Sequence, residues 1–149
     1  PFLEGDDFHD AAAVAKMRGG QPLDDADRWP WLDRLGRALG DAARDHGRAV
    51  AACSALKAAY RERLAAAAGG ATRFVLLDND RDVLLHRLAN RPGHYMPASL
   101  LDSQLETLER PHPGEPVMTL DSSLPPERLC DAAMAWLELP APGAGLSFR

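Results

Sequence analysis

The sequence predicts an α/β fold built on a parallel sheet, and three observations support this prediction. Short apolar segments alternate with segments whose apolar residues recur every three or four positions, as strands separated by helices do. The segments between the apolar runs are long enough for helical crossovers, which parallel strands require. A chain of 149 residues with 46% hydrophobic and 26% charged residues fits one globular domain and excludes collagen-like or wholly disordered proteins.

The first part of the chain predicts the end of a strand and a short helix. The apolar pair Phe2-Leu3 precedes a polar stretch, which is typical of a short strand that runs into a loop. A helix is expected over residues 10–18, because Gly19, Gly20 and Pro22 then interrupt the chain.

The longest helix is expected over residues 24–45. Asp24 suits its N-cap, Asp25 and Asp27 suit the positive end of the helix dipole, and Gly47 suits its end. Its apolar positions form one stripe that should face the core: Trp31, Leu32, Leu35, Ala38, Leu39 and Ala42.

The remainder of the chain alternates strands and helices. The continuously apolar run 49–53 predicts a strand buried on both faces. Further strands are expected over 73–78 and 117–121, and helices over 56–68, 80–90, 98–109 and 126–139. The tail 140–149 is rich in Pro, Gly and Ala and is expected to be flexible.

Composition excludes several classes of protein. A formal charge of −5 argues against a nucleic-acid binder, and no apolar run reaches the roughly 18 residues of a membrane span. Cys53 and Cys130 are too isolated for a disulfide framework or a metal motif, and they suit a reducing cytosol. His46, His86 and His112 have no ligand spacing, so no metal site is expected on these side chains.

Ligands of parallel α/β sheets bind at the carboxyl ends of the strands. This rule selects four polar stretches, at residues 4–9, 53–57, 78–80 and 121–123. The first stretch offers three carboxylates and His9, which can bind substrate hydroxyls or supply a general base, or else form a solvated loop with a helix cap.

The second stretch and two groups of arginines allow a functional and a structural interpretation each. Ser54 and Lys57 can bind an anion or a hydroxyl at a helix start, or belong to a tight turn with a capping serine. Arg28 can bind a carboxylate ligand, or belong to a capped helix whose flanking tryptophan is core. Arg87 and Arg91 can clamp phosphates, or compensate a helix dipole, beside a Pro/Gly loop that can act as a lid.

Taken in order, four segments resemble the gluconokinase family of small P-loop kinases. They are FLEGDDFH at 2–9, KM with GQPLDDADRWPWL within 16–32, CSALK with YR within 53–61, and RPGHYMP with LL, SQ and TLE within 91–109. The resemblance extends to about residue 139 and is far more specific as an ordered set than any single motif.

The resemblance implies a three-layer P-loop kinase fold of the nucleoside-kinase type. It implies the transfer of a phosphoryl group from ATP, with Mg²⁺, to the 6-hydroxyl of D-gluconate, which yields 6-phospho-D-gluconate. It further implies a cytoplasmic enzyme that forms a homodimer. Phosphoryl transfer of this kind depends on positioning and positive charge rather than on covalent chemistry.

The resemblance also implies roles for individual residues. Asp6 matches the acidic residue near the substrate hydroxyls and is the candidate base, and His9 matches the histidine of the same loop. Lys16 and Arg28 match basic residues of the substrate-binding helices, with Arg28 expected at the gluconate carboxylate. Four further positions match the family.

Of these four, Ser54 and Lys57 match the turn that lines the substrate pocket. Arg91 and His94 match the lid over the ATP phosphates, and Arg87 is a further candidate there. The chain departs from the family pattern at Ala13, where Asn is frequent and a polar substrate contact is therefore in doubt, and at Pro92 and Arg110.

The largest departure is that no G-x-x-x-x-G-K-[ST] phosphate loop occurs in the 149 residues. We therefore expect residues 1–139, with a lid at about 91–109, to be a kinase domain without its first strand, phosphate loop and helix. Because that strand is central in the family, we expect a gap inside the sheet and no activity of these residues alone. The alternatives are a non-catalytic remnant that binds a sugar acid or a partner, and a kinase of another small hydroxy acid such as shikimate.

Overall fold

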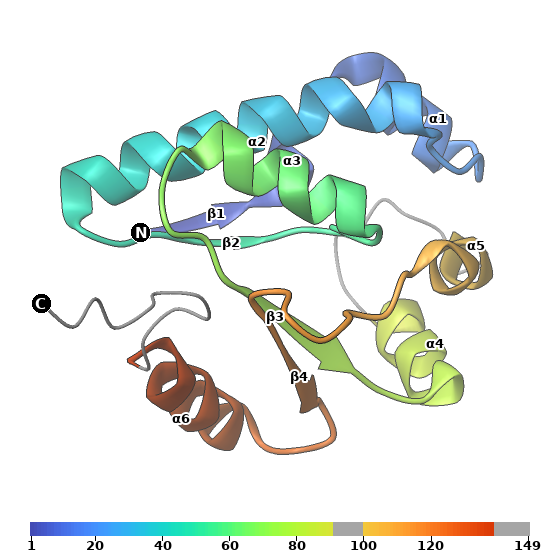
Figure 1. Cartoon of the computed structure of the whole chain (residues 1–149). Coiled ribbons are helices and arrows are strands. Elements are labelled where there is room, and N and C mark those ends of the chain that lie inside the picture. The colour runs from blue at the N-terminus through green and yellow to red at the C-terminus, as the bar shows by residue number, and fades with distance from the viewer. Residues whose placement is uncertain (91–99, 139–149) are drawn as a thin grey trace, which may run out of the picture.

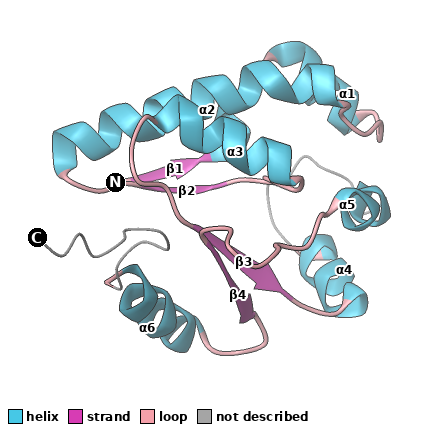
Figure 2. Cartoon of the chain, viewed as in Figure 1, coloured by secondary structure: helices cyan, strands magenta, loops and turns pink. Residues whose placement is uncertain are grey.

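The computed structural model describes residues 1–90 and 100–138. Figure 1 shows two pairs of strands with helices around them, and Figure 2 separates these elements from the loops. In chain order the elements are β1 (Phe2–Glu4), the 3-10 helix η1 (Gly5–Phe8), α1 (Ala11–Arg18), α2 (Asp25–His46), β2 (Val50–Ala52), α3 (Ala58–Ala68), β3 (Phe74–Asp78), α4 (Arg81–Ala89), α5 (Leu101–Thr107), β4 (Val117–Asp121) and α6 (Pro126–Leu137).

All four described strands pair in parallel, which confirms the predicted α/β class. They form two separate two-stranded sheets, β1–β2 and β3–β4, instead of one continuous sheet. Glu4 lies opposite Ala52 in the first sheet, and Asp78 lies opposite Asp121 in the second. That a further strand belongs between the two pairs stays a prediction.

The capping of α2 follows from the acidic residues that the sequence places at its start. The Asp24 carboxylate accepts the N–H of Asp27 at 3.0 Å, and the Asp27 carboxylate accepts the N–H of Asp24 at 3.0 Å. This reciprocal pair satisfies two donors that a helix start leaves free. Gly47 ends the helix with a φ of 79°, which glycine adopts without strain.

The main core forms where α2 and α3 cover one side of the β1–β2 sheet (Figure 1). Its fully buried side chains are Trp31, Leu32 and Leu35 of α2 with Tyr60 and Leu64 of α3. The predicted stripe is therefore correct in its first half. Farther along α2, the positions facing α3 are Gly36 and Gly40, and Ala38, Leu39 and Ala42 are only partly buried.

These glycines allow the two helices to approach closely. A Cβ atom on Gly40 would lie 2.2 Å from the carbonyl oxygen of Ala68, and one on Gly36 would lie 2.5 Å from the Cβ of Ala67. Both distances are shorter than atomic radii permit, so the backbone contact requires glycine on α2.

The prediction that the strand at 49–53 is buried on both faces is wrong for the described structure. Val50 is 59% exposed, and on β3 the side chain of Leu77 is 54% exposed. No described element packs over these apolar side chains on the open side of either sheet. A strand edge beside such an uncovered face presents unpaired backbone N–H and C=O groups.

Other boundaries differ by a few residues from the predictions. Helix α3 begins at Ala58 instead of residue 56, and α5 covers Leu101–Thr107 within the predicted 98–109. Ala13 is buried with Met17, Leu23 and Leu100, so it serves a small apolar cluster. Among the described helices, none has the length and apolar character needed to cross a bilayer.

We predict that Gly40→Ala lowers the free energy of unfolding by up to about 2 kcal/mol. Overpacking against the Ala68 backbone costs about 1–3 kcal/mol, and the higher helix propensity of alanine returns about 1 kcal/mol. Urea unfolding followed by circular dichroism measures the change. The matched control is Gly70→Ala, where a Cβ atom meets nothing within 4 Å, and an equal loss in both variants would contradict the packing argument.

Candidate functional site

The carboxyl ends of β1 and β2 bring two of the predicted polar stretches together. Because Glu4 and Ala52 are paired in the parallel register, residues 5–9 and residues 53–57 leave the sheet at the same edge. The first turns of α2 border this edge, since Trp31 of α2 reaches the carbonyl oxygen of Gly5. We therefore locate the candidate site between η1, the 53–57 turn and the start of α2.

Trp31 fixes the loop that carries Asp6 and His9. Its Nε1 donates to the Gly5 carbonyl oxygen at 2.7 Å, and its ring stacks on the His9 ring at a centroid distance of 4.5 Å. Gly5 itself contacts the end of β2, where a Cβ atom would lie 2.3 Å from the Ala52 carbonyl oxygen. The half-buried Asp6 is thus placed at the strand ends by one indole and one glycine.

His9 carries a buried polar atom with no partner among the described residues. Its Nδ1 is shielded from solvent and makes no hydrogen bond. Burial lowers the pKa of His9 below 6.5, against the opposing effect of the Asp6 carboxylate, so the imidazole is neutral at pH 7. A neutral imidazole with an unsatisfied nitrogen can bind a hydroxyl group.

Arg28 is a buried cation at the same edge. It is 7% exposed, its Nε donates to the Leu23 carbonyl oxygen at 3.4 Å, and its guanidinium lies 5.6 Å from the centroid of the Tyr60 ring. Burial lowers the pKa of Arg28, although an arginine remains charged at neutral pH. Within residues 1–90 and 100–138, no carboxylate forms an ion pair with it, which is unusual for a buried charge.

Lys16 and Lys57, in contrast, are both paired with the first turn of α2. The Lys16 ammonium contacts the carboxylates of Asp27 and Asp24, and the Lys57 ammonium lies 2.8 Å from Asp25. Hydrogen bonds to these partners raise the pKa of both lysines. Their charges are therefore largely compensated in the structure as it stands.

Neither interpretation of the 53–57 turn is correct in full. The N-cap residue of α3 is Lys57, so Ser54 does not cap the helix. The N–H of Ala58 donates at 2.7 Å to Glu109, whose carboxylate occupies the place that an anionic ligand would take. Ser54 is half-buried, and its carbonyl oxygen accepts the N–H of Leu56 at 2.9 Å.

The cysteine beside Ser54 is partly buried against the main core. Burial raises the pKa of Cys53 to about 11, with a smaller contribution from the charges of Asp6 and Glu4. Cys53 is therefore an inert thiol at neutral pH, and its charge neighbours show that Asp6 lies close to this turn.

A second polar group forms at the carboxyl ends of β3 and β4. The Arg87 guanidinium donates to the Ser122 carbonyl oxygen at 2.7 Å and to its hydroxyl at 3.0 Å, and Asn79 donates to the same hydroxyl at 3.1 Å. Arg87 also borders a cavity of about 610 Å³, whose other lining residues are Leu84, His86, Leu88, Asn90 and Leu101. Arg91 and His94 lie outside the described residues.

The remaining departure in this region has a structural role. Arg110, where the family pattern has proline, forms an ion pair with Asp78 at the end of β3. This pair links the segment that follows α5 to the second sheet.

Sequence reasoning missed several residues that shape the site. Tyr60 donates its hydroxyl to Asp25 and lies under the cations of Arg28 and Lys57. Ser122, which holds Arg87, was selected only as part of a polar stretch. Tyr60 lies in one of the segments that resemble the family. Nothing in the sequence shows that it contacts Arg28 and Asp25, which precede it by 32 and 35 positions.

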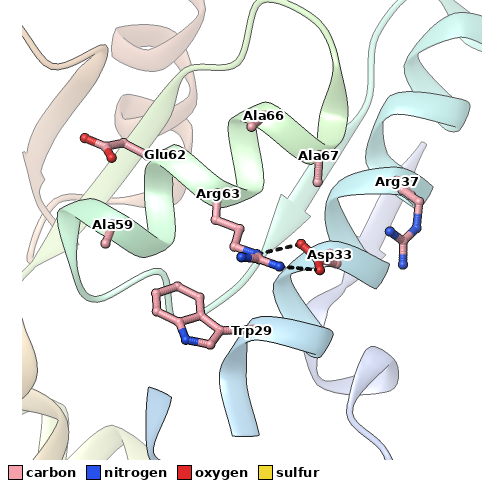
Figure 3. Close-up of a pocket in the computed structure, with 8 residues that line it drawn as sticks. All are labelled: Trp29, Asp33, Arg37, Ala59, Glu62, Arg63, Ala66 and Ala67. Atoms are coloured by element: carbon pink, nitrogen blue, oxygen red, sulfur yellow. Dashed lines mark hydrogen bonds and ion pairs between the residues drawn. The ribbon is translucent and has the colours of Figure 1, made fainter. Parts of the chain in front are cut away.

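A cavity of about 570 Å³ lies apart from these residues, between α2 and α3 (Figure 3). Arg63 forms a two-pronged ion pair with Asp33 there, with both nitrogen–oxygen distances 2.7 Å, and its guanidinium stacks near Trp29. None of the predicted site residues lines this cavity, so we do not include it in the candidate site.

Comparison with known proteins places the chain among sugar-acid kinases. No family model matches it. It is 46% identical over 126 residues to a gluconokinase of Gluconobacter oxydans (strain 621H), a match that covers 85% of this chain and 70% of the relative. It is 42% identical over 114 residues to the thermosensitive gluconokinase of Escherichia coli (strain K12), covering 76% of this chain and 60% of the relative. The chain thus spans 60–70% of the length of these two relatives.

Solved structures agree with the sequence matches. An unliganded sugar kinase from Janibacter sp. HTCC2649 superposes with a TM-score of 0.82 at 42% identity, over 94% of this chain and 80% of that one. A gluconokinase from Sinorhizobium meliloti 1021 superposes with a TM-score of 0.77 at 42% identity, over 92% and 76%. The likeness confirms the kinase fold that the ordered segments predicted. On the extent and identity of these matches, the chain belongs to the gluconokinase family.

Proposed function

We propose that this protein takes part in the ATP-dependent phosphorylation of D-gluconate at its 6-hydroxyl, which gives 6-phospho-D-gluconate. The observation that carries the proposal is Arg28, a buried guanidinium that forms no ion pair with a described carboxylate. A sugar acid supplies the missing anion, and a planar guanidinium matches a carboxylate in two hydrogen bonds. Family membership supports the same substrate class.

In this proposal the other site residues bind and orient the hydroxyl groups. The unsatisfied Nδ1 of His9 and the Asp6 carboxylate are placed at the strand ends, where polyol hydroxyls can donate and accept hydrogen bonds. Asp6 accepts the proton of the 6-hydroxyl as its oxygen bonds to the terminal phosphorus of ATP and the bond from that phosphorus to ADP breaks. Ser54 and Lys57 line the opposite side of the site.

The described residues do not by themselves form a complete site for Mg²⁺ and ATP phosphates. No group of three His, Cys, Asp or Glu side chains that suits a metal ion is found in the described ranges, and the sequence has no phosphate-loop motif. Arg87, held by Ser122, is one cation that can serve the nucleotide half. We propose that Mg²⁺ and the phosphates bind chiefly to residues outside these 149.

Two features support the proposal that residues 1–139 are a kinase domain without its first strand and helix. The strands form two separate pairs, and apolar side chains such as Val50, Val75 and Leu77 are exposed on their open side. One more parallel strand would pair with the free strand edges, and a helix would cover these apolar side chains. A homodimer and a cytoplasmic location are proposed from the family resemblance alone.

The alternative function is binding of a sugar acid without turnover. It is favoured by the missing phosphate-loop motif and shares the substrate half of the site. The two functions differ in whether phosphate is transferred, and the experiments below separate them.

We predict that Arg28→Met weakens gluconate binding at least about tenfold, because the sugar carboxylate loses its charged partner. The KM for gluconate, measured in a form of the enzyme that carries a phosphate-binding loop, reports the change. Arg37→Met is the matched control, since Arg37 is an exposed arginine of the same helix. An unchanged KM in Arg28→Met would remove Arg28 from the substrate site.

We predict that Asp6→Asn in the same form lowers kcat by about 10²–10⁴-fold, since the amide cannot accept the hydroxyl proton. The KM for gluconate should change far less than kcat. Asp7→Asn, a change of the exposed neighbouring carboxylate, serves as the control. Near-normal turnover in Asp6→Asn would show that another group is the base.

We predict that the 149-residue chain by itself forms no 6-phosphogluconate from gluconate and ATP. The reason is the absence of a phosphate-loop motif, whose backbone and lysine hold the transferred group. A coupled assay with 6-phosphogluconate dehydrogenase detects the product. Measurable turnover would contradict our account of the nucleotide half.

A further inference from the structure

We infer that Arg61 is a positioning residue: it fixes the 53–57 turn, which carries Ser54 and Lys57, against the segment 109–115. The inference rests on the proposed function only for the effect on gluconate. The placement of the turn follows from contacts of the described residues.

Arg61 is a buried arginine whose donors are directed at backbone oxygens. It is 6% exposed, and its Nη1 donates to the carbonyl oxygens of Ala55 at 3.4 Å, Leu56 at 3.2 Å and Glu109 at 3.2 Å. Two of these oxygens belong to the turn and the third lies 48 residues away in sequence. One guanidinium therefore holds two distant segments together.

The charge of Arg61 is balanced by Glu115. Its Nε donates to the Glu115 carboxylate at 2.8 Å, and the side chain of Glu115 is only 16% exposed. The other oxygen of that carboxylate accepts the backbone N–H of His112 at 3.1 Å. Glu115 also precedes β4, so the ion pair connects α3 on the first sheet with the start of the second.

Glu109 makes a second tie between the same two segments. Its carboxylate accepts the N–H of Ala58 at 2.7 Å, and its own N–H donates to the Leu56 carbonyl oxygen at 2.9 Å. Leu56 is thus contacted by both Arg61 and Glu109. Charged side chains thus hold the turn from outside, in addition to its own hydrogen bond from the Leu56 N–H to the Ser54 carbonyl oxygen.

The consequence concerns where the substrate-binding groups lie. Ser54 precedes the two tied carbonyls and Lys57 follows them, so a loosened turn displaces both side chains. Arg61 acts on the site through the turn, since its described contacts are with the backbone oxygens of residues 55, 56 and 109 and with the Glu115 carboxylate. Its effect on the reaction is therefore expected in the binding of gluconate, and not in the binding of ATP.

Cys53 provides a readout that does not depend on activity. Its side chain is partly buried at the start of the turn, and burial raises its pKa to about 11. In the 149-residue chain carrying Cys130→Ser, Cys53 is the sole thiol. We expect Arg61→Met to accelerate its reaction with Ellman's reagent about tenfold or more, since loss of a charged hydrogen-bond network opens the turn.

The matched control is Arg63→Met on the same helix. Arg63 is an exposed arginine that pairs with Asp33 in the α2–α3 cavity and touches neither segment (Figure 3). Its replacement should leave the Cys53 rate within about twofold of the parent. A rate in Arg61→Met equal to that in Arg63→Met, with both proteins folded by circular dichroism, would overturn the inference.

Glu109→Gln provides a second variant in case Arg61→Met does not fold. Glu109 is exposed, so its replacement leaves the core intact while weakening the tie to Ala58. We expect a smaller acceleration of Cys53 in the same direction, and a rate equal to the parent would count against the inference. Arg61→Lys keeps the charge but not the fork of donors, and it should restore part of the protection.

Kinetics in a form with a phosphate-binding loop test the effect on substrate. Arg61→Met should raise the KM for gluconate about tenfold and leave the KM for ATP nearly unchanged. Equal changes in both constants would show general destabilisation and overturn the positioning role. If the parent enzyme does not phosphorylate gluconate, the proposed function fails, while the Cys53 rates still decide whether Arg61 fixes the turn.

Discussion

The buried indole of Trp31 is the contact on which the site and the first sheet both depend. It is 1% exposed, packs in the core between α2 and α3, and donates to the Gly5 carbonyl oxygen at 2.7 Å. The His9 ring stacks on the Trp31 ring. Because the same side chain fills the core and holds the η1 loop, core packing determines where Asp6 and His9 lie.

Carboxylates at the start of α2 compensate the charges of the two lysines nearby, but none of the described carboxylates forms an ion pair with Arg28. Asp24 and Asp27 cap the helix, and these two carboxylates and that of Asp25 pair with the two lysines nearby. Arg28, one residue after Asp27, forms no ion pair with a described carboxylate, and its guanidinium stacks near the Tyr60 ring instead. A buried cation of this kind costs free energy, and the proposed binding of a sugar carboxylate would offset that cost.

The sequence predicted most of the fold because the local signals were strong. The aspartate cap of α2, its glycine end and the alternating segments predicted the described α-helices and strands to within a few residues, whereas the 3-10 helix η1 lies where a loop was expected. The burial of residues 49–53 could not be predicted, since apolar composition does not show which side of a strand is covered. The pairing of Lys16 and Lys57 with aspartates was equally invisible, because ion pairs across 11 and 32 positions depend on how α2 meets its neighbours.

By itself, the sequence determined the α/β class, the order of elements and the residues that resemble a sugar-acid kinase. These depend on local propensity, periodicity and ordered motifs, which are written along the chain. Only the tertiary structure decided that Arg28 is buried with no ion-pair partner among the described residues, that Glu109 occupies the start of α3, and that Arg61 joins segments 48 residues apart. Burial and long-range hydrogen bonds arise when distant segments pack together, so they become visible only in three dimensions.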